Sequence, residues 1–352
     1  MRLNTKIMSI LSTALIAASC TNTTYLDFPG TEPLIVMNAQ ISTSDSVHVV
    51  KLSKSTLSVA DGLRGAVVTA SVERDGTSTP VTVTEQPVSD EYGSERNPVD
   101  YSFKFKFRPG DRLTLKASAA SLPDASATVT APDAVEIVSV DTVSVKPGKN
   151  EDPNRSKYLV RVKIKDIPGQ QNYYRISPTY DEKVVFKVSY WDYNEETMEG
   201  ERIFTGETEE YEAFDRRVTI DLSSEPLFSG GSSLGGGLFD DLIDSEYGTY
   251  SYNTFTDSAF EDSEYALRIY VFLDLIVTAA ADAEEIESAH AEIKMNVWSM
   301  SFEQFHYLKA IGYDSDMGVF AEAVTIPSNV EGGTGQVSIE TRSSVTFMEL
   351  DR

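Results

Sequence analysis

Apolar and polar residues alternate with a period of two along several short segments of this chain. The clearest segment runs from Tyr101 to Phe107, where aromatic residues at odd positions alternate with Ser102, Lys104 and Lys106. Residues 158–165 alternate in the same way. Because successive side chains of a strand point to opposite faces, this pattern predicts strands that each bury one face.

Turn signals separate further apolar segments in the first part of the chain. Asp61-Gly62, Asp75-Gly76 and Pro109-Gly110 are typical of tight turns. Between them we expect strands at 34–39, 47–52, 66–72, 80–84, 101–107, 113–117 and 125–130. Short strands at such regular spacing predict an immunoglobulin-like antiparallel β-sandwich over residues 34–133.

The remaining residues, 134–352, predict a second β-rich domain. We expect strands at 135–145, 158–165, 173–177, 184–190, 264–277, 289–298, 319–327 and 336–349. A chain of 352 residues is also long for one small core, which favours two domains. The expected fold is therefore mainly β, with two antiparallel β-sandwich domains.

One segment in the second domain has helical rather than strand periodicity. Ser301 and Gln304 have the spacing of a capping box, in which the serine hydroxyl accepts from the glutamine amide and the glutamine side chain reaches back. Phe305, Leu308 and Ile311 then form one apolar stripe. The pattern predicts a short helix over residues 301–311, ended by Gly312.

The N-terminus has the order of a secretory signal rather than of a membrane span. Arg2 and Lys6 precede a short apolar core, and small residues lead to Cys20, which is the single cysteine. This order is similar to a bacterial lipoprotein signal, so we expect a signal peptide at 1–19, lipidation of Cys20 and a polar tether at 20–33. The alternatives are a plain secreted protein and a buried core cysteine.

The charge balance narrows the choice of partners. The chain has 55 acidic and 30 basic residues, for a net charge of −25. Residues 181–264 alone hold 22 acidic and five basic groups. Such a surface disfavours nucleic acid and anionic lipid headgroups as partners. The alternative is that the negative charge only keeps the protein soluble and has no specific role in binding.

The sequence lacks the motifs of common enzymes and cofactor sites. Its three histidines have no metal-ligand spacing, and the serine-hydrolase elbow and the phosphate-binding loop are absent. We therefore expect no enzyme, no cofactor and no metal site. One alternative stays open at Asp240, Asp241, Asp244 and Glu246, which either share a calcium ion or form a solvated acidic loop.

A cluster of aromatic residues is the most distinctive candidate for binding a ligand or a protein partner. Tyr247, Tyr250, Tyr252 and Phe255 cluster beside acidic residues. If exposed, they would stack on sugars or grip a protein partner, and otherwise they cover the edge of a core.

Residues 34–40, 47–55, 65–68 and 239–244 are similar to segments of one known family. Through these segments the chain resembles the Bacteroidota lipoproteins grouped as domain-of-unknown-function family 4249. The most specific match runs from Phe320 through Pro327 to Gly335, although Ala323 and Thr334 depart from the family's pattern. Asn329 and the glycines suit a tight turn, so we interpret this signature as structural.

The resemblance implies a lipid-anchored outer-membrane protein, often encoded beside TonB-dependent transporters, and it implies no activity. Our first hypothesis is a non-catalytic accessory or substrate-binding subunit of such a transporter, with its anchor in the outer membrane and its bulk at the cell surface. The alternative is a fimbria-associated or adhesin-type structural β-sandwich lipoprotein, since such subunits exchange strands.

Exported proteins of this bacterial group can also carry O-glycans on Asp-Ser or Asp-Thr followed by a small or apolar residue. Three triplets fit, with acceptors at Ser46, Thr142 and Ser258. Chance occurrence is the alternative. Ser46 and Ser258 lie in polar loop-like segments, and Thr142 lies within a strand pattern.

Overall fold

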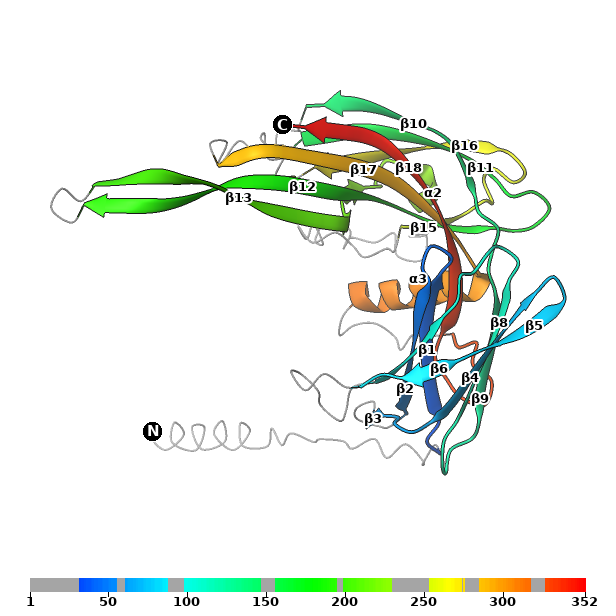
Figure 1. Cartoon of the computed structure of the whole chain (residues 1–352). Coiled ribbons are helices and arrows are strands. Elements are labelled where there is room, and N and C mark those ends of the chain that lie inside the picture. The colour runs from blue at the N-terminus through cyan, green and yellow to red at the C-terminus, as the bar shows by residue number, and fades with distance from the viewer. Residues whose placement is uncertain are drawn as a thin grey trace, which may run out of the picture. The chain divides into compact units, whose positions relative to one another are not determined.

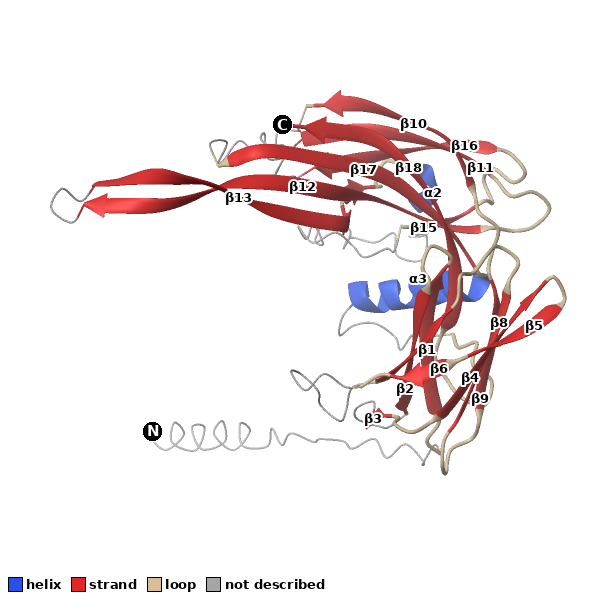
Figure 2. Cartoon of the chain, in the orientation of Figure 1, coloured by secondary structure: helices blue, strands red, loops and turns tan. Residues whose placement is uncertain are grey.

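The computed structural model describes residues 32–55, 61–87, 98–146, 156–194, 199–229, 253–273, 275, 285–317 and 327–352. These residues are mainly in strands, as the sequence predicts (Figures 1 and 2). The sheets lie within the compact unit Leu34–Arg352.

The elements up to residue 165 are β1 Ile35–Ser42, β2 Val47–Lys54, β3 Asp61–Gly62, β4 Val67–Arg74, β5 Thr77–Val81, β6 Val83–Glu85, β7 Val99–Lys104, β8 Arg112–Ser118, β9 Ala125–Thr130, β10 Glu136–Val145 and β11 Ser156–Lys165. The later elements are β12 Tyr173–Asn194, β13 Glu199–Arg217, β14 Thr219–Asp221, α2 Pro226–Ser229, β15 Thr254–Thr256, β16 Glu264–Leu273, β17 Ile286–Met300, α3 Phe302–Met317 and β18 Val337–Asp351.

A ten-stranded sheet forms one layer of both sandwich-like parts. Its main path runs β13-β12-β17-β18-β1-β2-β7-β6, with β15 and β3 added beside it. The sheet β5-β4-β8-β9 and the sheet β10-β11-β16-β14 form the second layers. Because each strand has one apolar face, packing a second sheet against it removes that face from water.

Two large hydrophobic cores fill these layers, and a small third cluster includes Phe305 and Leu308 of α3. The first includes Phe103, Phe107 and Leu115, and the second includes Val160, Tyr174 and Leu267. The alternation at 101–107 is confirmed, since its aromatic residues at 101, 103 and 107 are buried. The division into domains at residues 133 and 134 stays a prediction, because the compact unit contains both cores.

The last strand, β18, joins the two parts. Its first four residues pair in parallel with Ala39–Ser42 of β1, and Thr341–Asp351 pair antiparallel with β17. Among pairs of described strands, β1–β18 is the single parallel pair, whereas the sequence predicted antiparallel sheets throughout. Val337 and Ile339 accordingly belong to the first core although they lie near the C-terminus.

The structure corrects three details of the predicted elements. The strands expected at 173–177 and 184–190 are one strand, β12, and its partner β13 was not predicted. The helix is confirmed near the C-terminus, but α3 continues through Gly312 to Met317. The strand expected at 319–327 falls almost wholly outside the described residues.

Candidate functional site

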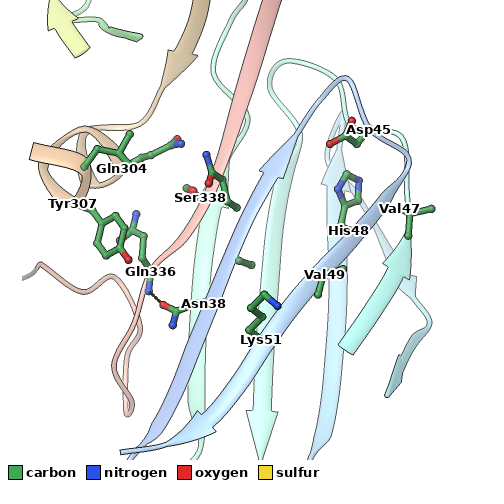
Figure 3. A pocket seen from close by; sticks show the side chains of 13 residues that line it. Asn38, Asp45, Val47, His48, Val49, Lys51, Gln304, Tyr307, Gln336 and Ser338 are labelled. Carbon is green, nitrogen blue, oxygen red and sulfur yellow. Dashed lines mark hydrogen bonds between the residues drawn. The ribbon is translucent and has the colours of Figure 1, made fainter. Parts of the chain in front are cut away.

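A groove with a volume of about 410 Å³ lies between α3 and the outward-facing side of β1 and β2. We call it the amide groove, because four of its lining side chains are carboxamides (Figure 3). These are Asn38 and Gln40 on β1, Gln304 on α3, and Gln336 just before β18. Residues of β2 with outward side chains, Val47, Val49 and Lys51, complete one wall.

Glu340 of β18 anchors one end of the amide groove. Both of its carboxylate oxygens lie 3.0 Å from Nη2 of Arg175, and the guanidinium also packs over the ring of Trp298 at 4.2 Å. Burial lowers the pKa of Arg175, and the nearby Glu340 opposes that shift. A buried arginine needs such a charged partner, so this pair fixes the position of the Glu340 carboxylate.

Glu340 in turn orients Gln304. The Nε2 amide of Gln304 donates to Oε2 of Glu340 at 2.9 Å. A carboxylate accepts hydrogen bonds but cannot donate them, so the Nε2 end of the Gln304 side chain must face Glu340. Its Oε1 atom therefore points away from Glu340. The Oε1 atom of Gln304 has no hydrogen-bond partner among the described residues, although the residue is only 2% exposed.

Gln336 presents a second incompletely paired amide. Its backbone N–H donates to Oδ1 of Asn38 at 2.9 Å, and its carbonyl accepts from the amide of Ala39 at 2.9 Å. The backbone is therefore fixed against β1, and the side chain lines the groove. Within the described part of the chain, neither Nε2 nor Oε1 of Gln336 has a partner, and the residue is 5% exposed.

Another groove, of about 400 Å³, lies beside the start of α3 and lacks this feature. Its buried polar side chains are satisfied: Asn172 donates to Asp166, Asp257 and two carbonyls, and Ser299 accepts from the amide of Val135. We therefore take the amide groove as the candidate ligand site.

A second feature is the hairpin arm, defined as residues 188–194 of β12 and 199–206 of β13. The pairing of β12 with β17 ends at Phe186, so the arm extends past its neighbour (Figure 1). Trp191 and Tyr193 of the arm are 64% and 52% exposed. An isolated two-stranded hairpin is only marginally stable in water, so an arm of this kind needs support from its side chains.

Trp191 and Tyr193 lie on the same face of the arm. Trp191 pairs with Arg202 and Tyr193 with Gly200 across the ladder, and the Arg202 guanidinium lies 5.4 Å from the Trp191 ring centroid. A Cβ atom at Gly200 would lie 3.1 Å from the Trp191 ring and 3.3 Å from the Tyr193 ring. The two rings therefore cover the glycine and remain open to solvent on their other side.

The structure does not describe most of the residues that the sequence proposed for binding. Cys20, Tyr247, Tyr250, Tyr252 and the calcium alternative at Asp240, Asp241, Asp244 and Glu246 lie outside the described residues. Phe255 is described, but it is 2% exposed and packs against Tyr174 and Phe228, each at 5.5 Å between ring centroids. Its ring belongs to the second core and does not face a partner.

The three O-glycosylation triplets differ in exposure. Asp45 and Ser46 are exposed in the turn between β1 and β2, and Val47, the first residue of β2, is also exposed. Ser258 is exposed, but the neighbouring Asp257 is fully buried and accepts from the backbone and side chain of Asn172. Thr142 is exposed on β10, at the edge of its sheet. Modification at all three stays a prediction.

Among the described residues, no cluster of histidine, cysteine or carboxylate side chains suits a metal ion. The described helices likewise include none that is long and apolar enough to span a membrane. His48 is buried and bonds the carbonyl of Phe105 at 2.8 Å, and burial lowers its pKa, which fits a structural role.

Comparison with known protein families identifies the chain. The family model described as Domain of unknown function (DUF4249) matches residues 22–345. The chain belongs to the DUF4249 family. No curated protein matches this DUF4249 chain.

One solved structure with weak similarity is the C-terminal globular domain of an oligosaccharyltransferase from Pyrococcus abyssi. It is 12% identical to the DUF4249 chain, with a TM-score of 0.11, and the alignment covers 68% of this chain and 47% of that one.

The segment that most resembles the DUF4249 family is described from residue 327 to residue 335, and these residues have a structural role. Gly332 and Gly335 have positive φ, and a Cβ atom at Gly335 would lie 2.2 Å from the carbonyl oxygen of Met37. Asn329 acts through its side chain rather than through positive φ, since it pairs with the N–H and C=O of Val337 at 2.9 and 2.6 Å. The turn delivers the chain to β18 and places Gln336 in the amide groove.

Proposed function

We propose that this DUF4249 protein is an outer-membrane lipoprotein, anchored through Cys20 with its bulk at the cell surface. It serves as a non-catalytic accessory or substrate-binding subunit of a TonB-dependent nutrient transporter. The lipoprotein-like N-terminus and the family resemblance support the anchor. The hairpin arm is the observation that carries the proposal of a protein partner.

The arm has the composition of an interface rather than of a solvated loop. Exposed tryptophan and tyrosine are enriched at the centres of protein interfaces, where they bury large areas at low entropic cost. Asp192 and Glu201 pair across the opposite face of the arm. The arm therefore suits a partner that offers an apolar pocket edged by basic residues.

The edge of β13 favours docking through side chains rather than through strand addition. Its middle part carries Glu207, Glu209 and Glu210, and positive φ at Gly206 and Asp215 interrupts the regular strand. Charged side chains and irregularities at an edge strand oppose pairing with another chain. This argues for a transporter partner over the alternative, a fimbria-associated or adhesin-type subunit that exchanges strands.

Site-specific crosslinking tests the partner. A photoreactive benzoylphenylalanine at position 193 should yield a covalent product with an outer-membrane β-barrel protein in native cells. The same group at position 143, which is exposed on β10, should not. Absence of a product from position 193, or equal products from both positions, would refute the arm's role. Filaments on overexpressing cells in electron micrographs would favour the alternative.

A further inference from the structure

The buried amides of Gln304 and Gln336 leave three hydrogen-bonding atoms without protein partners among the described residues. A buried polar atom without a partner costs roughly 1–3 kcal/mol, so such atoms are rare unless water or a ligand completes them. Both side chains line the amide groove, so a molecule in the groove would lie beside them.

We propose that the amide groove binds a neutral, hydroxyl-rich ligand, of which a saccharide is the most common biological form. This inference rests on the proposed substrate-binding role and names the substrate class. The unpaired atoms include both a donor and acceptors. A hydroxyl group both donates and accepts, so a polyol satisfies this set better than a carboxylate or an ammonium group would.

The electrostatics of the groove agree with a neutral ligand. Its lining holds one acidic and one basic side chain that face solvent, Asp45 and Lys51, and Lys51 is already paired with Asp100 at 3.0 Å. The other polar groups are amides, a serine and a tyrosine hydroxyl, together with the buried His48. An anionic or cationic ligand would find no matching cluster of charge in this lining.

The apolar part of the groove suits a sugar ring. Tyr307 on α3 lies beside Gln336 in the groove, and Val47 and Val49 of β2, which are 52% and 37% exposed, lie farther along the lining (Figure 3). An aromatic ring packs against the C–H face of a sugar while amides bind the hydroxyls at its edge. The volume of about 410 Å³ lies within the usual size of small-molecule sites.

The side-chain amide of Gln304 and the backbone of Gln336 are held in place before any ligand arrives. Glu340 fixes Gln304, and Arg175 fixes Glu340. Asn38 and Ala39 fix the backbone of Gln336. Prior positioning of this kind reduces the entropic cost of binding, which matters for a ligand with few apolar atoms.

Calorimetric titration of the full-length lipoprotein in detergent tests the proposal. The probes are neutral hexoses, pentoses and their disaccharides, offered up to millimolar concentration. At least one should bind, and Gln336→Met should weaken that binding at least tenfold. Gln171→Met, which replaces an exposed amide outside the groove, should leave it unchanged.

Two further measurements separate a loss of ligand binding from a loss of folding and test the role of Tyr307. Thermal unfolding of Gln336→Met should show no loss of stability, because the substitution removes a buried amide that has no partner among the described residues. Tyr307→Ser should also weaken binding if a sugar ring packs there. Lack of binding by every probe, or equal binding by the wild type and Gln336→Met, would overturn the proposal. Crosslinking from position 193 should persist in Gln336→Met, so the two proposals fail separately.

Discussion

Gln304 on α3 donates its side-chain amide to Glu340 on β18 at 2.9 Å, instead of returning to cap its own helix. The other half of the predicted capping box is present, since the backbone amide of Gln304 donates to Oγ of Ser301 at 3.3 Å. The helix is thus tied to the strand that joins the two cores. Glu340 therefore holds together α3, β18 and, through Arg175, β12.

Replacement of Glu340 by glutamine should destabilise the protein strongly. The variant leaves the buried Arg175 without an anionic partner, which costs about 3 kcal/mol. Glu210→Gln is the matched control, because its pair with Lys183 is exposed and such pairs contribute little. Urea unfolding measures both. Equal losses in the two variants would show that Glu340 is not an anchor.

Alanine at Gly335 should be more harmful than alanine at Gly110. Both glycines have positive φ, but only at Gly335 would the new Cβ meet backbone, 2.2 Å from the oxygen of Met37, whereas nothing lies within 4 Å at Gly110. We expect a loss of roughly 3 kcal/mol or more for Gly335→Ala and about 1–2 kcal/mol for Gly110→Ala. Thermal unfolding separates them, and similar melting temperatures would count against the tight approach.

Acid should weaken the fold through Asp111. Burial alone would raise the pKa of this carboxyl, but hydrogen bonds from Arg74 and from the amide of Arg108 outweigh burial and lower it. A carboxyl with a lower pKa in the folded state stabilises above its unfolded pKa, and that contribution disappears as the pH falls through the folded value.

The Asp111→Asn variant should therefore lose about 2 kcal/mol near neutral pH. Its stability should also depend less on pH than that of the wild type below about pH 4. Urea midpoints measured from neutral to strongly acidic pH give both quantities. Asp100→Asn is the control, since its pair with Lys51 is exposed. Parallel pH curves for wild type and Asp111→Asn would contradict the assignment.

The sequence predicted the first sandwich well, because its strands alternate cleanly and its turns carry glycine or proline. It divided β12 in two because Asp181, Glu182 and Lys183 interrupt the apolar pattern. In the structure, Asp181 pairs with Lys294 on β17, and Lys183 pairs with Glu210 and Glu212 on β13. Cross-strand partners of opposite charge thus let acidic and basic residues sit inside strands.

The amide groove had no signal in the sequence. Gln336 and Asn38 are 298 positions apart, and a lone glutamine has no motif. Gln304 was singled out only as a capping residue. The site arises because β18 pairs with β1 in parallel, a long-range contact that local periodicity cannot indicate.

Replacement of Cys20 by alanine should release the protein from membranes. Several acyl chains anchor a protein far more firmly than one, so the unlipidated variant should appear in the soluble periplasmic fraction. Fractionation of native cells measures this. Continued recovery of Cys20→Ala with the membranes would show that the lipoprotein interpretation is wrong.

The measurement that bears most directly on the proposed function is purification of the tagged protein from native membranes in mild detergent. An outer-membrane β-barrel of the TonB-dependent class should be recovered with the wild type. It should be lost from a variant with both Trp191→Ala and Tyr193→Ala, and kept by Gln336→Met. Repeated recovery of the wild type as a lone monomer would contradict the account.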